Sequence, residues 1–274
     1  MSSTRFFDVF MPALEQAGRY ALEIRDRIES RPQKTGDAWT SVVTDADLGV
    51  QHYLEAVALA EFPTWGFWGE ERDASFHTPY FPNDAEYLLA LDPINGTRIY
   101  RERGDDFDII MSLIRRGRVE ATLSYMPVRR QFYGADLETG AFLQQAGQGR
   151  APLRVDNASM TLAVYKADDW LASLPDAVTV YDTLGAYVSG DPRNCMNNVF
   201  HGQIGGYLMG ATPLLDVGAT AFTVAQAGGL ATQPDGQPFR HFEHFDPARA
   251  EPLLVCANLE LHAAVSHAIA GAKP

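Results

Sequence analysis

The sequence predicts an α+β fold, in which a half built on an antiparallel sheet is followed by a smaller α/β half. Two observations lead to this prediction. Helical periodicity comes first and is followed by short β-prone runs separated by turn signals, a pattern typical of an antiparallel meander. After residue 151, strands alternate with helices, as in an α/β unit. We expect the halves to span residues 1–155 and 156–274 and to enclose a cleft.

Two helices are predicted at the start of the chain. In residues 6–30, apolar side chains recur at helical spacing, and the segment RPQKTGDAW then ends the helix. Helical spacing resumes near Asp47 and stops at Pro63, because proline cannot continue a helix. Both helices belong to the first half, which also contains the predicted sheet and most of the candidate metal ligands.

The predicted sheet begins with a short strand at 64–70. The apolar run 87–91 is a second strand, which delivers Asp92 into the turn sequence Pro-Ile-Asn-Gly-Thr. The antiparallel meander is expected at 107–115, 118–126 and 130–134. In the second half we expect strands at 161–165, 178–181, 206–209 and 253–257, a helix at 216–227 that ends at Gly228-Gly229, and a final helix.

Composition limits the function classes. The formal net charge is −13, which disfavours binding to a nucleic acid polymer and favours binding of cations. The only cysteines, Cys195 and Cys256, are too few for a disulfide framework. No apolar run is long enough to cross a bilayer, and the first residues do not resemble a secretion signal. The composition therefore predicts a soluble cytoplasmic protein that does not bind membranes.

Carboxylates stand at predicted turns or element boundaries in four segments. Magnesium takes oxygen ligands, usually a few carboxylates with water and substrate phosphate, so acids gathered at strand ends could bind it. Any one acid could instead be a solvated surface group, and Asp216 or Asp47 could instead cap a helix. The segments are VTDAD at 43–47, WGEE at 68–71, LDPINGT at 91–97 and LDVGA at 215–219.

Together these segments resemble the inositol monophosphatase superfamily of magnesium-dependent, lithium-sensitive phosphatases, whose pattern includes DPIDGT and a later WDxAAG segment ending in AGG. The similarity covers nearly the whole chain, including PDGQPF after the AGG helix. It implies a layered α/β/α/β/α sandwich and a homodimer. It also implies Mg2+-dependent hydrolysis of a small phosphorylated polyol, sugar or nucleotide by metal-activated water.

The resemblance implies a site with one to three Mg2+ ions. The ligands of the first ion match Glu70, Asp92 and the backbone carbonyl of Ile94, and those of the second match Asp92, Asn95 and Asp216. Glu70 therefore serves catalysis through the ion that holds the attacking water, and Asp47 and Thr97 match the pair that deprotonates this water. Backbone N–H groups at Gly96 and Thr97 would hold phosphate oxygens, and Glu71 either supports the site or is a solvated neighbour.

Asn95 departs from the family pattern, which has aspartate there. An amide oxygen can coordinate Mg2+ but brings no negative charge, so we expect a weakened second metal site. The chain could retain phosphatase activity, be specialised for another substrate, or bind a ligand without turning it over. Leu215, where the family usually has tryptophan, is expected to affect packing beside Asp216.

Substrate selection is the least determined feature. Arg98, Arg101 or Arg103 could clamp a further anionic or hydroxyl group, or form a solvated loop of paired charges. The length of this loop resembles the branch that acts as 3′(2′),5′-bisphosphate nucleotidase. The positions where the family selects substrate are Tyr187, Asp191, Arg193 and Asn194. We expect no chemical role for Cys195 or for the histidines His201, His241 and His244.

Overall fold

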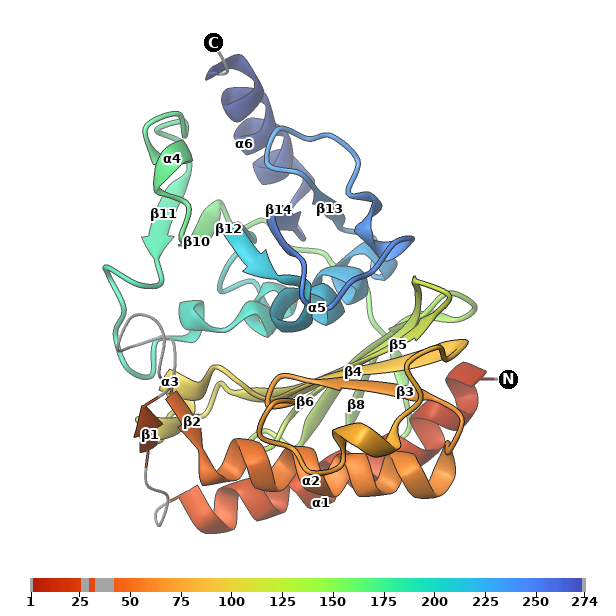
Figure 1. Cartoon of the computed structure of the whole chain (residues 1–274). Helices are drawn as coiled ribbons and strands as arrows, with labels where there is room; N and C mark the ends of the chain where they lie inside the picture. Colours follow the sequence, from red (N-terminus) through yellow and green to blue (C-terminus); the bar gives the residue numbers. More distant parts are fainter. Residues whose placement is uncertain (1, 26–29, 33–41, 273–274) are drawn as a thin grey trace.

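The computed structural model describes residues 2–25, 30–32 and 42–272. Its layers follow the order helix, sheet, helix, sheet, helix, which runs from bottom to top in Figure 1. Two helices cover one face of a seven-stranded sheet, a central helix separates it from a five-stranded sheet, and a last helix covers the outer face of the second sheet. The predicted α+β class and layered arrangement are confirmed.

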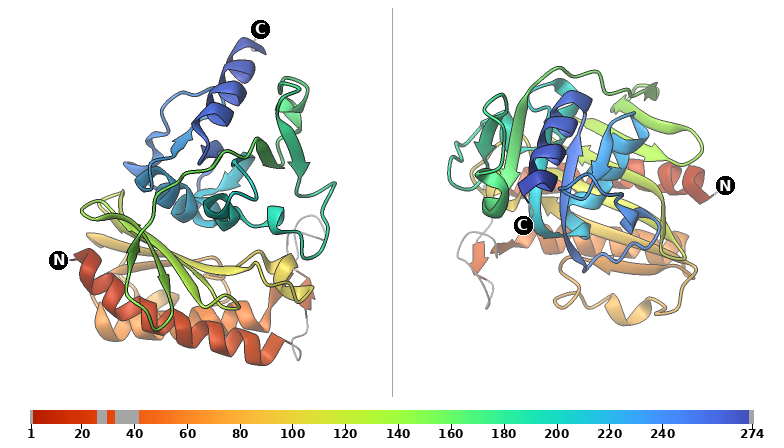
Figure 2. Two further views of the ribbon diagram at one scale, coloured as in Figure 1. Left: turned by 180° about the vertical axis from the view of Figure 1, so that it is seen from behind. Right: turned by 90° about the horizontal axis from the view of Figure 1, so that it is seen from above.

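The first layer consists of α1 (Ser2–Ile24) and α2 (Asp45–Glu61). Both helices run along the lower face of the large sheet in Figure 2, and the apolar stripe of α1, with Phe6 and Leu14, is fully buried there. The helix predicted at 6–30 ends at Ile24 in the structure. Residues 26–29 of that prediction, and residues 33–39 of the predicted break, lie outside the described residues.

The large sheet has the strand order β3-β4-β5-β6-β7-β8-β9. β3 pairs with β4 in parallel and all the other pairs are antiparallel, which confirms the predicted meander and extends it by two strands. The strands are β3 (Gly66–Gly69), β4 (Tyr87–Asn95), β5 (Asp108–Arg115), β6 (Arg118–Met126), β7 (Gln131–Asp136), β8 (Gly140–Gln145) and β9 (Ala151–Pro152). A separate pair is formed by β1 (Ser30–Pro32) and β2 (Val42–Thr44), and β2 leads directly into α2.

The smaller sheet has the order β11-β10-β12-β14-β13, with β10 parallel to both β11 and β12. Its strands are β10 (Thr161–Tyr165), β11 (Thr179–Asp182), β12 (Gly206–Pro213), β13 (Leu230–Thr232) and β14 (Ala250–Cys256). The helices associated with it are α4 (Asp168–Leu171), α5 (Leu214–Gln226) and α6 (Leu259–Ala272). The short helices elsewhere are α3 (Thr97–Arg101), η2 (Thr78–Tyr80), η3 (Pro192–Asn194), η4 (Met196–His201) and η5 (Arg240–Phe242).

The central helix α5 differs from its prediction at one end. It begins at Leu214 with Pro213 as its N-cap, so the interpretation of Asp216 as a capping residue is wrong. Its other end agrees with the prediction, because Gly228 has a φ of 100° and takes the left-handed conformation that stops the helix. Asp216 therefore lies inside the first turn of a helix packed between the sheets.

The division of the chain at residues 155 and 156 stays a prediction. The strands of the large sheet end at Pro152 and those of the smaller sheet begin at Thr161, so the predicted boundary lies between the sheets. None of the helices in the described part of the chain is long and apolar enough to cross a membrane.

Candidate active site

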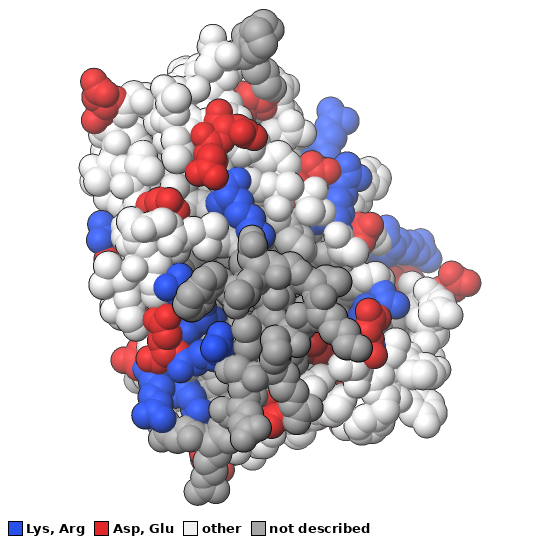
Figure 3. Space-filling view, turned by 60° about the vertical axis from the view of Figure 1, so that its left-hand side comes forward, with Lys and Arg blue, Asp and Glu red and all other residues white. Residues whose placement is uncertain are grey.

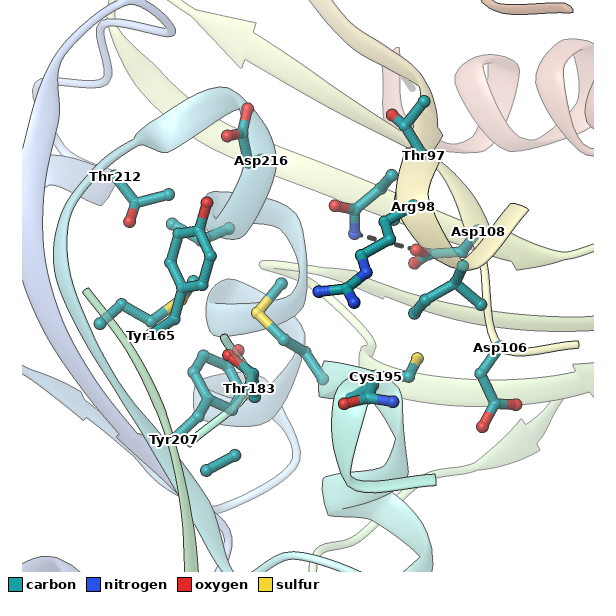
Figure 4. Close-up of a pocket in the computed structure, with 18 of the residues that line it drawn as sticks. Thr97, Arg98, Asp106, Asp108, Tyr165, Thr183, Cys195, Tyr207, Thr212 and Asp216 are labelled. Carbon is teal, nitrogen blue, oxygen red and sulfur yellow. Dashed lines mark hydrogen bonds between the residues drawn. The ribbon is translucent and has the colours of Figure 1, made fainter. Parts of the chain in front are cut away.

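A cavity of about 260 Å³ lies between the two sheets. Its lining comes from β4 and α3 of the first half and from β10, β12 and the start of α5 of the second. Figure 4 shows Asp216 and Thr97 at the same end of this cavity, on opposite sides of it. The lining includes these predicted site residues: Glu70, Asp92, Ile94, Asn95, Gly96, Thr97, Arg98, Arg193 and Asp216.

A β-bulge at the end of β4 aims two of the predicted ligands to the same side. Asp92 and Asn95 are three residues apart, a spacing that places side chains on opposite faces of a regular strand. The register with β5 shifts between them, so that Asp92 pairs with Ile110 and Asn95 with Asp108. The partners are two residues apart and share a face, so the bulge returns Asn95 to the face of Asp92.

Asp92 is 3% exposed and lines the cavity. Burial, followed by the charges of Glu70 and Asp216, raises its pKa well above the usual value. Burial and the charge of Asp216 likewise raise the pKa of Glu70 to about 8, while a hydrogen bond with Asp92 opposes the rise. The raised pKa values of both groups favour a proton shared between the two carboxyls.

Asp216 faces this pair from α5. Burial raises its pKa to about 6, and the positive charge of Lys166 opposes that rise. Lys166 directly follows β10, and its positive charge acts on Asp216. Lys166 was not identified from the sequence, because its position relative to Asp216 depends on the tertiary structure.

Asp47 and Glu71 lie behind the cavity lining. Asp47, in the first turn of α2, is 1% exposed, and its charge acts on both Glu70 and Glu71. Glu71 is 7% exposed, so the interpretation of a solvated neighbour is wrong. Burial and the charge of Asp47 raise the pKa of Glu71 to about 7, while its backbone N–H donates to Gln51 Oε1 at 2.9 Å.

The turn after β4 positions Thr97. Gly96 takes a φ of 85° as the N-cap of α3, which a residue with a side chain adopts only under strain. The hydroxyl of Thr97 donates to the carbonyl of Ile94 at 3.1 Å, and the N–H of Ile94 donates to Asp92 Oδ1 at 3.1 Å. One turn thus links Asp92 with the predicted backbone ligand, the carbonyl of Ile94, and with the predicted relay hydroxyl of Thr97.

The predicted substrate arginines are paired with acids and stacked on rings. Arg98 lies over Tyr187, with the guanidinium carbon 3.6 Å from the ring centroid, and its Nε donates to Glu102 at 3.1 Å. Arg193 lines the cavity while bound to Asp191, which does not line it. Arg101 and Arg103 are exposed and lie outside this cavity. Figure 3 shows one face of the molecule on which basic and acidic groups likewise lie side by side.

The side of the cavity opposite Arg98 is largely aromatic and apolar. Figure 4 places Tyr165, Thr183, Tyr207 and Thr212 there. The ring of Tyr207 is buried, and among the described residues its hydroxyl has no hydrogen-bond partner. Burial raises the pKa of Cys195, which also lines the cavity, so this thiol stays protonated and fits the predicted absence of a chemical role.

A buried acid that the sequence analysis did not identify is Asp108. It is 2% exposed at the start of β5, and burial raises its pKa to about 6 against hydrogen bonds from Ser124, Asn95 and Asn197. The sequence contained one indication that Asp108 is buried, because this charged residue directly precedes the apolar run Ile-Ile-Met of a predicted strand. Its partners come from three other elements, and only the folded chain brings them together.

The chemistry of this site fits a magnesium ion. All the predicted donors are oxygen atoms, from carboxylates, one side-chain amide and one backbone carbonyl, and Mg2+ prefers such hard ligands. As the side chains stand, no group of three or more Asp, Glu, His or Cys residues in the described ranges is arranged to hold a metal ion. Glu70 and Asp92 are hydrogen-bonded to each other, so the proton between these carboxyls would have to leave before both could bind one ion.

Comparison with known proteins agrees with this chemistry. The model of the inositol monophosphatase family matches residues 7–271, which is nearly the whole chain. The chain belongs to the inositol monophosphatase family. The members of this family are metal-dependent phosphomonoesterases that use Mg2+ and bind phosphorylated metabolites. The resemblance stated from the sequence is therefore confirmed.

The chain is similar to several proteins of this family that carry different names. A 3′(2′),5′-bisphosphate nucleotidase CysQ of Haemophilus influenzae is 32% identical over 107 residues, which cover 39% of this chain and 39% of that protein. A putative Nus factor SuhB of Neisseria meningitidis serogroup B is 23% identical over 93% of this chain and 97% of its own length. The structure of Thermotoga maritima IMPase is similar with a TM-score of 0.73 at 18% identity, covering 96% of this chain and 97% of that one.

Proposed function

We propose that this chain is a Mg2+-dependent phosphomonoesterase that hydrolyses a small phosphorylated metabolite. One observation carries the proposal. Predicted ligands and catalytic groups from separate segments of the sequence line a single cavity between the two sheets: Glu70, Asp92, Ile94, Asn95, Thr97 and Asp216.

The chain would hold Mg2+ with oxygen atoms from both halves. Glu70, Asp92 and the carbonyl of Ile94 would hold the first ion. Asp92, Asn95 and Asp216 would hold the second. Bound Mg2+ supplies Lewis-acid activation of water and of the phosphoryl oxygens. Because Asn95 is neutral, the second ion is held with less local charge than an aspartate at this position would give.

The chain itself handles the proton and the phosphate. Thr97 takes the proton of the attacking water as its own hydroxyl proton passes to Asp47. For this step the hydroxyl, which donates to Ile94 here, turns toward Asp47. The backbone N–H groups of Gly96 and Thr97 hold phosphate oxygens in line with the attack. Glu71, buried beside Asp47, maintains the negative field around the relay.

The alcohol part of the substrate would lie against the aromatic side of the cavity. Tyr165 and Tyr207 offer planar and apolar surface, whereas a fully hydroxylated ring needs many polar partners. Arg98 and Arg193 line the same cavity and could bind a second anionic group. These features favour, as a second candidate, a 3′(2′),5′-bisphosphate nucleotidase activity over hydrolysis of a polyol phosphate.

Phosphate release from a substrate panel tests both candidates. The panel contains an inositol monophosphate, a sugar phosphate, histidinol phosphate and adenosine 3′,5′-bisphosphate, each with Mg2+ and with EDTA. We expect Mg2+-dependent release, highest for the bisphosphate. If none of the substrates releases phosphate, the alternative of a non-catalytic binding protein stands, and Asn95→Asp then decides whether this site is disabled. The homodimer and the cytoplasmic location expected from the sequence are part of the proposal, and sedimentation of the purified protein tests the first.

A further inference from the structure

Asn95 and Asp108 form a pair across two neighbouring strands. They are Cα partners in the register of β4 and β5, at the shifted end of that strand pair. The amide nitrogen of Asn95 donates to Asp108 Oδ1 at 2.9 Å, and both residues line the cavity. The dashed line in Figure 4 marks this hydrogen bond. The neutral side chain at the predicted second metal site is thus in direct contact with an acid that belongs to a different strand.

Hydrogen-bond donors face both oxygens of Asp108. The hydroxyl of Ser124 accepts from the amide nitrogen of Asn197 at 2.7 Å and donates to Asp108 Oδ2 at 2.5 Å. Asn197 also donates to Asp108 Oδ2, at 2.9 Å. Together with the bond from Asn95 to Oδ1, this arrangement of donors stabilises negative charge on Asp108.

The surrounding side chains are arranged in favour of this charge. Asn197 directs its amide nitrogen to Asp108 and Ser124, while its own Oδ1 is buried without a partner among the described residues. A buried acceptor without a partner is unfavourable, so this orientation of Asn197 indicates that the surroundings favour a donor directed at Asp108. A buried carboxylate at the wall of a cavity, with donors gathered around it, is a fixed negative charge facing whatever the cavity holds.

The hydrogen bond also fixes the orientation of the Asn95 amide, with its nitrogen toward Asp108. The nitrogen and oxygen of an amide lie on opposite sides of the carbon between them, so an amide whose nitrogen is bound to Asp108 presents its oxygen to the other side. Amide nitrogen cannot bind a cation, whereas amide oxygen can. Without a fixed acceptor for the nitrogen, the amide of Asn95 could adopt either of two orientations. One of them would turn the nitrogen, which cannot bind a cation, toward the metal site.

We propose that Asp108 supplies the negative charge that Asn95 lacks and orients the amide of Asn95 so that Oδ1 faces the second Mg2+. Asp108 acts as a positioning residue through Asn95, and the pair together replaces one aspartate ligand. The inference rests on the proposed function for the identity of the cation. This inference differs from the expectation of a weakened second site. The negative charge is present, but it lies on Asp108 of β5 and not on residue 95 of β4.

Mn2+ titration tests this without relying on turnover. Free Mn2+ is followed by electron paramagnetic resonance at pH 7.5 with inorganic phosphate present, and the number and affinity of bound ions are fitted. The variants are D108N, N95D and the exchange N95D/D108N. Asp136→Asn is the matched control, because Asp136 is also a buried aspartate of the large sheet that accepts several hydrogen bonds, yet it lies outside the cavity. Circular dichroism confirms that each variant is folded.

The expected pattern is specific to a charge shared by the pair. D108N weakens the weaker class of Mn2+ site by about tenfold or more, as expected for an outer partner of a ligand. N95D alone does not bind Mn2+ more tightly, because the carboxylate at residue 95 then faces the carboxylate of Asp108 in place of the N–H···O hydrogen bond. The exchange variant restores the affinity to within about twofold of wild type. Asp136→Asn leaves Mn2+ binding unchanged.

Three outcomes would overturn the inference: unchanged binding in D108N, tighter binding in N95D alone, or an exchange variant as weak as D108N. If D108N does not fold, the exchange variant decides alone, since wild-type affinity supports the shared charge and a tenfold loss contradicts it. A chain that binds both ions but hydrolyses no phosphomonoester would remove the proposed function and leave this inference standing.

Discussion

The carboxyl groups of Glu70 and Asp92 are hydrogen-bonded to each other inside the cavity, although they come from different strands and would both be charged in water. In the protein without metal, one proton takes the place of a cation between them. Under the proposed function, Mg2+ bound between these carboxyls would displace this proton, so we expect metal binding to release protons.

The first prediction concerns pH and stability. Burial is the main cause that raises the pKa values of Glu70, Glu71 and Asp216 to about 8, 7 and 6. The same groups have pKa values near 4 in the unfolded chain. At a pH between the two values of a group, the folded protein therefore binds more protons than the unfolded chain. The free energy of unfolding of the metal-free protein then falls as pH rises from about 4.5 to 8. Thermal unfolding in EDTA at a series of pH values measures this.

Added Mg2+ should reverse the loss. At about 100 times its Kd, an ion that binds only the folded state adds about 2.7 kcal/mol, which raises Tm by roughly 5–10 °C for a chain of this size. The rise should be larger at pH 8 than at pH 6, because fewer protons have to be displaced. A Tm increase that is independent of pH would contradict the exchange of protons for metal.

The second prediction separates activity from stability at Asp92. Asp92→Asn keeps an oxygen that can accept from the N–H of Ile94 but removes the central charge, so phosphate release should fall by a factor of about 10³ or more. The same change should raise the Tm of the metal-free protein at pH 8, because an amide is neutral without binding a proton, whereas Asp92, with its raised pKa, must take one up on folding. Asp136→Asn should lower Tm and leave kcat unchanged, and a lower Tm in Asp92→Asn would argue against a destabilising acid cluster.

The third prediction compares two arginines of α3. Arg98 lines the cavity, whereas Arg101 on the same short helix is exposed outside it. Arg98→Ala should raise KM about tenfold for substrates with a second anionic group, since a charge-assisted hydrogen bond contributes about 1.5–3 kcal/mol. Arg101→Ala should leave KM unchanged. Equal effects of the two variants would show that the arginines act only through the net charge of the loop.

The fourth prediction compares two glycines with the same backbone conformation. Gly96 and Gly147 have φ values of 85° and 83°, and a Cβ atom at Gly147 would meet no atom within 4 Å. Alanine at either position should lower the free energy of unfolding by about 1 kcal/mol, because the left-handed conformation disfavours a side chain. Only Gly96→Ala should also lower kcat, because it moves the turn that carries Thr97. Steady-state kinetics and denaturant unfolding measure both effects, and equal kcat values would remove the role of this turn.

The sequence by itself determined the class of fold, the strand that ends in Asp92, the turn through Thr97 and the family. These features are local, because periodicity and turn residues act within a few positions of the chain. Its prediction for Asn95 was also local, since it considered only the side chain at that position and concluded that a charge was missing.

Only the tertiary structure decided which charges surround that position. Asp108 meets Asn95 because a bulge shifts the register of β4 against β5. Lys166 acts on Asp216 because β10 pairs with β12, the strand that leads into α5. Packing of the layers also decides that Glu71 is buried and that Arg98, but not Arg101, lines the cavity. Register and packing bring together residues far apart in the chain, and no periodicity in one segment specifies its partner in another.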